Sequence, residues 1–329
     1  MLKKVPGTKD ILPIEVSRWQ KIEEISRKTF SVYNYQEIRT PIIEDIAVYA
    51  RSLGEFTEIV QKQMFLVKNN EDTYVLRPEG TASVVRAYIE NSLDKTTGIA
   101  KFYYIGPMFR LERPQKGRLR QFHHIGAEVI GSGQAKVDIE VISLADRLLD
   151  EWGISGYEII VNSLGCQEDK KKLIKILKDA FKYERDNLCD ECQKRFQNNV
   201  LRILDCKNEG CQKVIKKLNL QDKHLCDDCS AHFTQVKSGL DALKIKYRIS
   251  PYLVRGLDYY TRTVFEITHK DLGAQDALGA GGRYDNLVKE LGGPDVSAMG
   301  FAFGIERLFL VHSLQSTDHS HSLCNSIRR

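Results

Sequence analysis

Hydrophobic residues recur every three or four positions over residues 14–30, 81–89 and 138–152, which is the spacing of an amphipathic helix. Shorter apolar runs, several of them rich in β-branched and aromatic residues, predict strands. Two of these runs, 64–67 and 73–77, are joined by a polar turn and predict a hairpin. Residues 33–45 predict a turn and a strand closed by Pro41, because proline cannot donate to a central ladder. The other predicted strands are residues 102–110, 121–130, 157–162, 264–267 and 298–304.

The pattern changes between residues 168 and 240, where the chain becomes rich in lysine and cysteine and mostly helical in spacing. Residues 168–237 hold 16 Lys and Arg against 12 Asp and Glu, which is most of the net charge of +5. Strand-like sequence resumes at Tyr247. We therefore expect an inserted module at 168–240, flanked by core segments 1–167 and 241–312. Residues 313–329 are polar and without periodicity, and we expect them to be disordered.

Composition places few limits on function. The 329 residues are 42% hydrophobic and 28% charged, as in ordinary globular proteins. The small positive charge permits a polyanionic partner without requiring one. No apolar run approaches the ~20 residues of a membrane span, and residues 1–9 lack the apolar core of a signal peptide. We therefore expect a cytoplasmic protein.

Six of the eight cysteines lie between Cys189 and Cys229. In a reducing compartment such clustering suggests a metal before disulfides. Two CxxC pairs, Cys189 with Cys192 and Cys226 with Cys229, supply the four thiolates of a structural Zn²⁺ site. The intervening cysteines, at 206 and 211, could replace one pair. The alternative is a set of reduced structural thiols.

Polar residues are concentrated where strands are predicted. Residues 255–261 hold an arginine, an aspartate, two tyrosines and a threonine just before an apolar strand. They form either a polar edge strand or the floor of a ligand pocket. Glu79 and Thr81 stand at a strand-to-helix corner and suit either helix capping or ligand contact. Arg110 and Glu128 lie in apolar arms around a basic loop, 111–120, and charges there need partners or a ligand. The loop itself could be a solvated face.

Several separated stretches resemble motifs 1, 2 and 3 of the class II aminoacyl-tRNA synthetases. They are the strand that carries Pro41, the Phe109-Arg110 strand with its basic loop, and the helix start at 304–308. Residues 253–266 and 280–285 resemble the two histidine-specific motifs of histidyl-tRNA synthetase. Residues 77–81 and 113–123 match that family as well. The resemblance covers about residues 3–312 and implies an α+β fold, with an antiparallel sheet flanked by helices and a helical insertion. It also implies a homodimer.

The resemblance implies that histidine attacks the α-phosphate of ATP to give histidinyl adenylate, and that the acyl group then passes to tRNA(His). Catalysis would rest on positive charge at the α-phosphate, which Arg110 and Arg255 would supply from two sides. Arg118 would hold the distal phosphates, Phe122 and Arg307 would enclose the adenine, and Mg²⁺ would accompany the pyrophosphate group.

The resemblance also implies a pocket for L-histidine. Glu128 and Tyr260 would contact the two ring nitrogens, and Tyr259 and Tyr284 would form the walls. Glu79, Gly80 and Thr81 would hold the ammonium group. Next to that group the bacterial family usually has glutamine, whereas this chain has His124. A protonated imidazole would repel the ammonium, so His124 could lower activity at acidic pH; a tolerated substitution is the alternative.

The family ends in an anticodon-binding domain of ~100 residues, and no such sequence follows Ser313. We expect either a truncated catalytic part or a naturally short relative, in which adenylate formation survives and efficient tRNA charging is in doubt. Two other functions stay open. The regulatory subunit of ATP phosphoribosyltransferase resembles this family, lacks that domain and senses histidine. A basic RNA-binding module without chemistry would leave the histidine-like pocket unexplained.

Overall fold

An eight-stranded sheet in the order β1-β5-β6-β11-β10-β9-β7-β8 forms the centre of the computed structural model, which describes residues 2–54, 57–68, 72–220, 222–273 and 276–312. Every pairing from β5 to β7 is antiparallel, and the edge strands β1 and β8 pair in parallel with β5 and β7. The predicted α+β fold is confirmed, with parallel pairs added at both edges. The strands are β1 (Gln36–Glu37), β5 (Ala100–Phe109), β6 (Gln121–Ile130), β7 (Tyr157–Ser163), β8 (Tyr247–Ile249), β9 (Thr261–His269), β10 (Ala277–Arg283) and β11 (Ala298–Gly304).

A second, three-stranded sheet holds the predicted hairpin. Strands β3 (Phe65–Lys68) and β4 (Thr73–Leu76) pair in antiparallel fashion, and β2 (Ile43–Asp45) pairs with the other edge of β4. The stretch 33–45 was predicted as a turn and a strand closed by Pro41, which is confirmed, but a second strand after Pro41 was missed. It forms β1 in the large sheet and β2 in the small one, with Pro41 between them. Because proline interrupts the ladder there, the chain can pass from one sheet to the other.

Helices cover both faces of the large sheet. Helix α1 (Pro13–Val32) buries Trp19, Ile22 and Phe30 at helical spacing, in the same core as α4 (Ala135–Glu151) and α8 (Asp227–Ala242). The other face packs against a second core, to which α2, α3 and α9 contribute. Neighbouring residues of a strand point to opposite faces, so Tyr103 and Tyr104 of β5 belong to different cores. These helices are α2 (Ile46–Leu53), α3 (Thr81–Glu90) and α9 (Leu287–Glu290).

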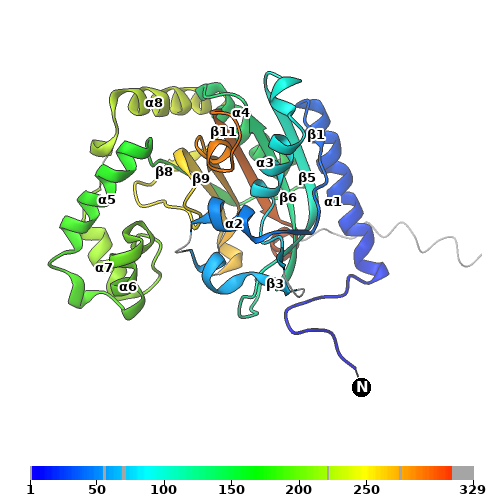
Figure 1. Ribbon diagram of the computed structural model, residues 1–329, viewed down its shortest axis with the longest axis horizontal. Coiled ribbons are helices and arrows are strands. Elements are labelled where there is room, and N and C mark those ends of the chain that lie inside the picture. Colours follow the sequence, from blue (N-terminus) through cyan, green and yellow to red (C-terminus); the bar gives the residue numbers. More distant parts are fainter. Residues whose placement is uncertain (1, 55–56, 69–71, 221, 274–275, 313–329) are drawn as a thin grey trace, which may run out of the picture.

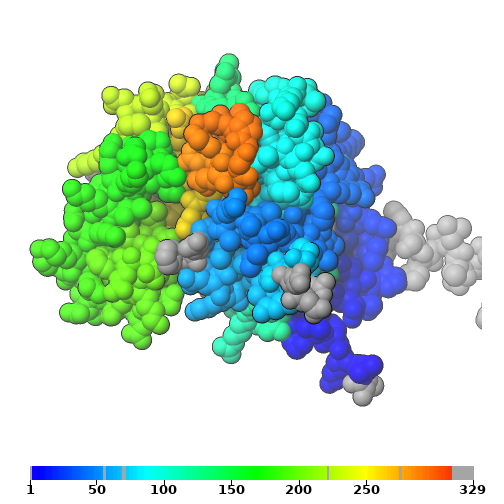
Figure 2. Space-filling view, viewed as in Figure 1, coloured from blue at the N-terminus to red at the C-terminus, as the bar shows by residue number. Residues whose placement is uncertain are grey.

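The predicted insertion leaves the sheet after β7 and returns at β8. Helices α5, α6 and α7 lie together at one side of the molecule, while α8 runs back toward α4 (Figure 1). The space-filling view shows the lobe in green directly beside the core (Figure 2). Because β7 and β8 pair in parallel, the chain must cross over between them, and the insertion forms this crossover. Its helices are α5 (Gln167–Phe181), α6 (Asp190–Asn198) and α7 (Glu209–Lys217).

None of the described helices is both long and apolar enough to cross a membrane. The predicted disordered tail, 313–329, lies outside the described residues. The chain is described as far as α10 (Ile305–Val311), which follows β11 directly as the sequence predicted.

Candidate active site

An open cavity of about 990 Å³, a volume that includes the solvent at its mouth, lies on the sheet between β6, β11 and β10. Ten of the thirteen predicted non-cysteine site residues line it. The other three lie directly behind its wall. The sequence therefore identified one continuous site from segments that are far apart in the chain. The lining residues among those predicted are Glu79, Thr81, Arg110, Arg118, Phe122, His124, Arg255, Tyr259, Tyr260 and Arg307, and those behind the wall are Gly80, Glu128 and Tyr284.

Two buried carboxylates meet at Thr81, where α3 begins. The side chain of Glu79 accepts hydrogen bonds from the backbone N–H groups of Thr81 and Ala82, at 2.7 and 2.8 Å. The Thr81 hydroxyl donates to Glu128 Oε1 at 2.7 Å. Burial raises the pKa of Glu79. Glu79 thus caps the helix, as one of the two roles left open by the sequence required, and it also lines the cavity.

Glu128 is fully buried and accepts hydrogen bonds from three hydroxyl groups, those of Thr81, Tyr104 and Tyr284. Desolvation raises the pKa of Glu128 to about 8 despite these bonds, and the nearby charge of Glu79 adds to the rise. Glycine is required opposite Glu128 in β11, because a Cβ on Gly300 would lie 1.7 Å from Glu128 Oε2. The sheet register therefore creates the space that the carboxylate fills.

Tyr104 is a site residue that the sequence reasoning missed. It lines the cavity, and its hydroxyl donates to Glu128 Oε1 at 3.3 Å. Its ring passes between Gly80 and Gly126, where a Cβ on either glycine would lie 2.4 Å from ring atoms. The available signal was the hairpin register, which pairs Tyr104 with Gly126. A large ring opposite a glycine marks a close packing site.

Three tyrosines form one wall. The rings of Tyr259 and Tyr260 lie 4.7 Å apart, and Tyr259 meets Tyr284 edge-on at 5.6 Å. Desolvation raises the pKa of Tyr260 to about 12, so its hydroxyl stays protonated at neutral pH. Each phenol can therefore donate to a ligand or accept from it. This segment forms the pocket floor that the sequence favoured over an edge strand.

Arginines gather at the other part of the cavity. Arg110 follows β5 directly, and its Nε donates to the Pro78 carbonyl at 2.9 Å. Its guanidinium carbon lies 5.3 Å from the centre of the Phe122 ring. Burial lowers the pKa of Arg110, but arginine remains charged at any physiological pH. The hairpin thus presents a fixed cation beside an aromatic face.

Three further arginines complete this part. Arg255 forms an ion pair with Glu266 of β9, while its Nε is buried and has no hydrogen-bond partner among the described residues. Arg118 lies on the basic loop and pairs with Glu112 at 3.1 Å. Arg307 of α10 donates to two backbone carbonyls, those of residues 117 and 277, at 3.0 and 2.6 Å. The basic loop therefore folds over the cavity and is more than a solvated face.

His124 lies between these two groups. Burial, followed by the charges of Arg110 and Arg307, holds the pKa of His124 well below its ordinary 6.5. Its Nδ1 is buried without a hydrogen-bond partner among the described residues. Of the two alternatives that the sequence left open, this favours a tolerated substitution, because burial and the nearby arginines oppose a second proton on His124. A neutral imidazole can accept a hydrogen bond from an ammonium group.

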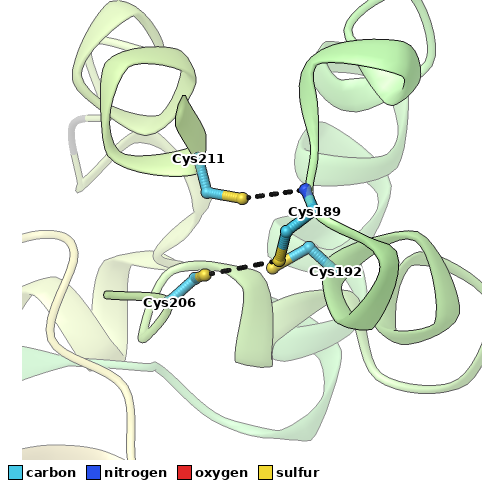
Figure 3. Close-up of side chains that lie close together, drawn as sticks. All are labelled: Cys189, Cys192, Cys206 and Cys211. Atoms are coloured by element: carbon cyan, nitrogen blue, oxygen red, sulfur yellow. Dashed lines mark hydrogen bonds between the residues drawn. The ribbon is translucent and has the colours of Figure 1, made fainter. Parts of the chain in front are cut away.

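The cysteines form two separate groups. Cys189 and Cys192 lie with Cys206 and Cys211, all four sulfurs within 4.8 Å of one another (Figure 3). Cys226 and Cys229 lie instead with Cys166 and Asp169. The set predicted from the two CxxC pairs is therefore not one site. The sequence had left open that residues 206 and 211 replace one pair, and the structure brings that set together where the start of α6 approaches the first turn of α7.

The cavity can hold an anion against its arginines and an ammonium group against Glu79, behind which Glu128 is buried. An amino acid that reacts with a nucleoside triphosphate needs both. A sheet with antiparallel central strands, an arginine at the end of the β5–β6 hairpin and another at the start of α10 are features of the class II aminoacyl-tRNA synthetases. That is the class of protein that this fold and site define.

Comparison with known proteins narrows the class. The family model for histidyl-tRNA synthetase matches residues 7–308, so the chain belongs to the histidyl-tRNA synthetase family. It is 49% identical over 305 residues to the histidine–tRNA ligase of Halothermothrix orenii, covering 92% of this chain and 73% of that protein. The histidine–tRNA ligase of Natranaerobius thermophilus is 47% identical over 313 residues, with 94% and 74% covered.

Solved structures agree with this assignment. Apo histidyl-tRNA synthetase of S. aureus superposes with a TM-score of 0.74 at 36% identity, covering 94% of this chain and 73% of that one. A Bacillus halodurans protein described as an ATP phosphoribosyltransferase regulatory subunit/histidyl-tRNA synthetase gives a TM-score of 0.70 at 22% identity, over 95% and 84% of the two chains. At that identity the second comparison shows the shared fold alone.

Proposed function

We propose that this chain activates L-histidine with ATP to form histidinyl adenylate and transfers the histidyl group to the 3′ end of tRNA(His). The observation that carries the proposal is the division of one cavity into a carboxylate part, lined by Glu79 with Glu128 buried behind Thr81, and an arginine part, at Arg110 and Arg255. An amino acid can place its ammonium group in the carboxylate part and its reacting carboxylate toward the arginine part.

Histidine would enter with its ammonium group near Glu79 and Thr81 and beside the neutral His124. Its ring would contact Tyr260 and Glu128. Because the pKa of Glu128 is raised to about 8, histidine would bind with release of the proton of this carboxyl. In its ionised form the carboxylate offers about four acceptor positions, and protein hydroxyls occupy three of them. One position is left for a ring N–H. Analogues without that donor would leave a buried acceptor unpaired, which is a strong basis for rejection.

ATP would bind as its Mg²⁺ complex with the adenine between Phe122 and Arg307. Arg118 would contact the distal phosphates. One histidine carboxylate oxygen attacks the α-phosphorus, the bond to the bridging oxygen breaks, and pyrophosphate leaves with that electron pair. Arg110 and Arg255 would stabilise the charge on the α-phosphate oxygens from two sides. The unpartnered Nε of Arg255 is a donor available for this purpose.

The partners and the division of the chain are part of the proposal. The core would consist of residues 1–167 and 241–312, and the basic insertion, 168–240, would contact tRNA through its phosphates. Charging of tRNA places the protein in the cytoplasm. A homodimer is supported by the small sheet, where Ile43, Val67 and Tyr74 share one face and are 52%, 38% and 36% exposed.

The four-cysteine group would hold a structural Zn²⁺. Its sulfurs lie within tetrahedral reach, and the backbone N–H of Cys189 donates to the Cys211 sulfur at 3.2 Å (Figure 3). Such N–H···S bonds stabilise thiolates, which are the form that binds metal. The cluster would tie α6 to α7. Zinc analysis of the purified protein tests this site, and a Cys189→Ser/Cys192→Ser variant should lose one equivalent.

Histidine-dependent ATP–pyrophosphate exchange tests the enzymatic proposal. We expect exchange well above a control without histidine, and a loss of about 10²- to 10³-fold in Arg255→Ala, since one preorganised donor to a developing charge contributes that much. Arg248→Ala is the matched control, because Arg248 is exposed on the edge strand β8 and pairs only with Glu158 of β7 among the ion pairs of the described residues. Histidine binding in calorimetry without any exchange would overturn the proposal in favour of a histidine-sensing regulatory role.

A further inference from the structure

The second group of metal-ligand residues lies where the insertion joins the core. Cys166, Asp169, Cys226 and Cys229 place one ligand atom each within 4.8 Å of the others. Together with the four-cysteine group, it accounts for all seven cysteines of the described residues. Such complete sorting into two clusters is unexpected for thiols that serve only as small hydrophobic residues.

Two helix N-termini meet at this group. Cys166 precedes α5 and Asp169 lies in its first turn, while Cys226 precedes α8 and Cys229 lies in its first turn. Each pair has the i, i+3 spacing of a metal-binding knuckle. The backbone N–H of Cys166 donates to the Cys229 sulfur at 3.2 Å, as occurs in the four-cysteine group. The positive ends of two helix dipoles favour negative ligands here.

Asp169 shows that the group is built for a ligand. Its side chain is fully buried, and its Oδ2 accepts no hydrogen bond from the described residues, although the thiols of Cys226 and Cys229 lie beside it. Its Oδ1 accepts from Lys172 at 3.2 Å. Glycine is required at position 165, just before Cys166, because Gly165 has a φ of 70° and a Cβ there would lie 2.4 Å from Asp169 Cβ. A buried carboxylate oxygen without a partner costs free energy that a cation would offset.

We propose that Cys166, Asp169, Cys226 and Cys229 bind a second Zn²⁺, separate from the four-cysteine site. Three thiolates and one carboxylate give the four-coordinate shell of a structural zinc ion, and soft thiolates select zinc over Mg²⁺ or Ca²⁺. The ion would link the start of α5, where the chain leaves the core, to the start of α8, which leads back to it. Since nearly the whole insertion lies between the two ligand pairs, this single ion closes its base.

The second site also bears on the active site, and this step rests on the proposed function. Lys170 follows Asp169 in α5, and its ammonium group donates to the carbonyls of Asp258 and Tyr260, at 2.8 and 3.0 Å. Those residues flank Tyr259 on the pocket floor. The ion therefore fixes the helix turn that holds the histidine-binding segment, which makes Asp169 a positioning residue. Its loss should raise the KM for histidine more than it lowers kcat.

Zinc stoichiometry on the full chain tests the proposal, with Zn²⁺ as the probe. We expect two zinc ions per chain in the wild type and one in Asp169→Asn, which keeps the shape of the side chain but removes its charge. Asp227→Asn is the matched control, because Asp227 is exposed in the first turn of α8, and it should keep two. Where Asp169→Asn retains some metal, chelator competition should show affinity at the second site weakened by about 10- to 100-fold, a typical effect at metal shells.

The experiment can refute either zinc site independently of the other. One zinc ion in the wild type that disappears in Cys189→Ser/Cys192→Ser would overturn the second site and leave the first. One ion that survives this variant and is lost in Asp169→Asn would support the second site and overturn the first. A zinc-free protein with all thiols reactive would overturn both. Pyrophosphate exchange is measured in parallel, so a failure of the proposed enzyme is recognised independently of metal content.

Discussion

Glu128 makes the stability of this protein depend on pH in a direction unusual for a glutamate. Desolvation raises its pKa from an ordinary 4.5 to about 8. Below about pH 4.5 the carboxyl is protonated in both the folded and the unfolded chain. Between about pH 4.5 and 8 the unfolded chain releases the proton and the folded chain keeps it. The folded state then binds more protons, so the free energy of unfolding falls as pH rises.

The magnitude follows from the difference between the two pKa values. At 1.36 kcal/mol for each pH unit between them, burial of Glu128 costs about 3 kcal/mol at pH 7 and about 5 kcal/mol at pH 8 and above. Glu128→Gln removes the titration but keeps the size and polarity of the side chain. We therefore expect the variant to gain stability relative to the wild type, by these amounts, as pH rises from about 5 to about 8.

The measurement is urea unfolding of the wild type and Glu128→Gln across that pH range at a fixed protomer concentration. Other titrating groups are common to both proteins, so they cancel in the difference. Glu24→Gln is the control, because Glu24 is exposed on α1. A difference between wild type and Glu128→Gln that does not change with pH would refute the reasoning, since it would mean that Glu128 ionises alike in both states.

Three further outcomes are expected. Gly300→Ala should displace the Glu128 carboxylate, because the new Cβ would lie 1.7 Å from its oxygen. Histidine-dependent pyrophosphate exchange should fall about 10²-fold. Unchanged exchange would contradict the close contact between Gly300 and Glu128. Arg283→Met should lower the free energy of unfolding by about 3–5 kcal/mol in urea, because it leaves Asp138 buried without the Arg283 guanidinium 2.6 Å away. A joint Asp138→Leu change should restore part of this loss. If the effects of the two substitutions simply add, Arg283 and Asp138 do not stabilise the fold as an ion pair. His124→Gln should leave the pH dependence of pyrophosphate exchange unchanged between about pH 6 and 8, because the pKa of His124 lies well below its ordinary 6.5. A decrease of wild-type activity toward pH 6 that the variant does not show would contradict this.

Much of the site was predictable because its chemistry is local in sequence. Arg110 and Glu128 are charges in apolar arms of one hairpin, and the tyrosines at 259 and 260 directly precede a strand. Side-chain period and strand pairing then bring these segments to one face of a sheet. The roles of the basic loop and of Arg307 at the start of α10 came instead from the resemblance to the motifs of class II aminoacyl-tRNA synthetases.

Other features depended on tertiary contacts that no local pattern encodes. The role of Tyr104 follows from its passage between Gly80 and Gly126, which are distant in sequence. The pKa of Glu128 depends on how completely the sheet and α3 exclude water. His124 stays neutral because arginines from other elements surround it. Burial and long-range charge arise only from packing, so residue type alone left open whether His124 is charged in mild acid.

The cysteines show most clearly what the sequence determines and what the tertiary structure decides. By itself the sequence determined that thiols are spaced as metal ligands and that a helical module interrupts the sheet, because spacing along a chain is a local property. The packing of helices decided which thiols meet. Cys226 and Cys229, which spacing would join to Cys189 and Cys192, lie instead beside Cys166 and Asp169. The first turns of α5 and α8, about 60 residues apart in the chain, meet there because α5 follows β7 and α8 leads into β8. The pairing of β7 with β8 exists only in the folded chain.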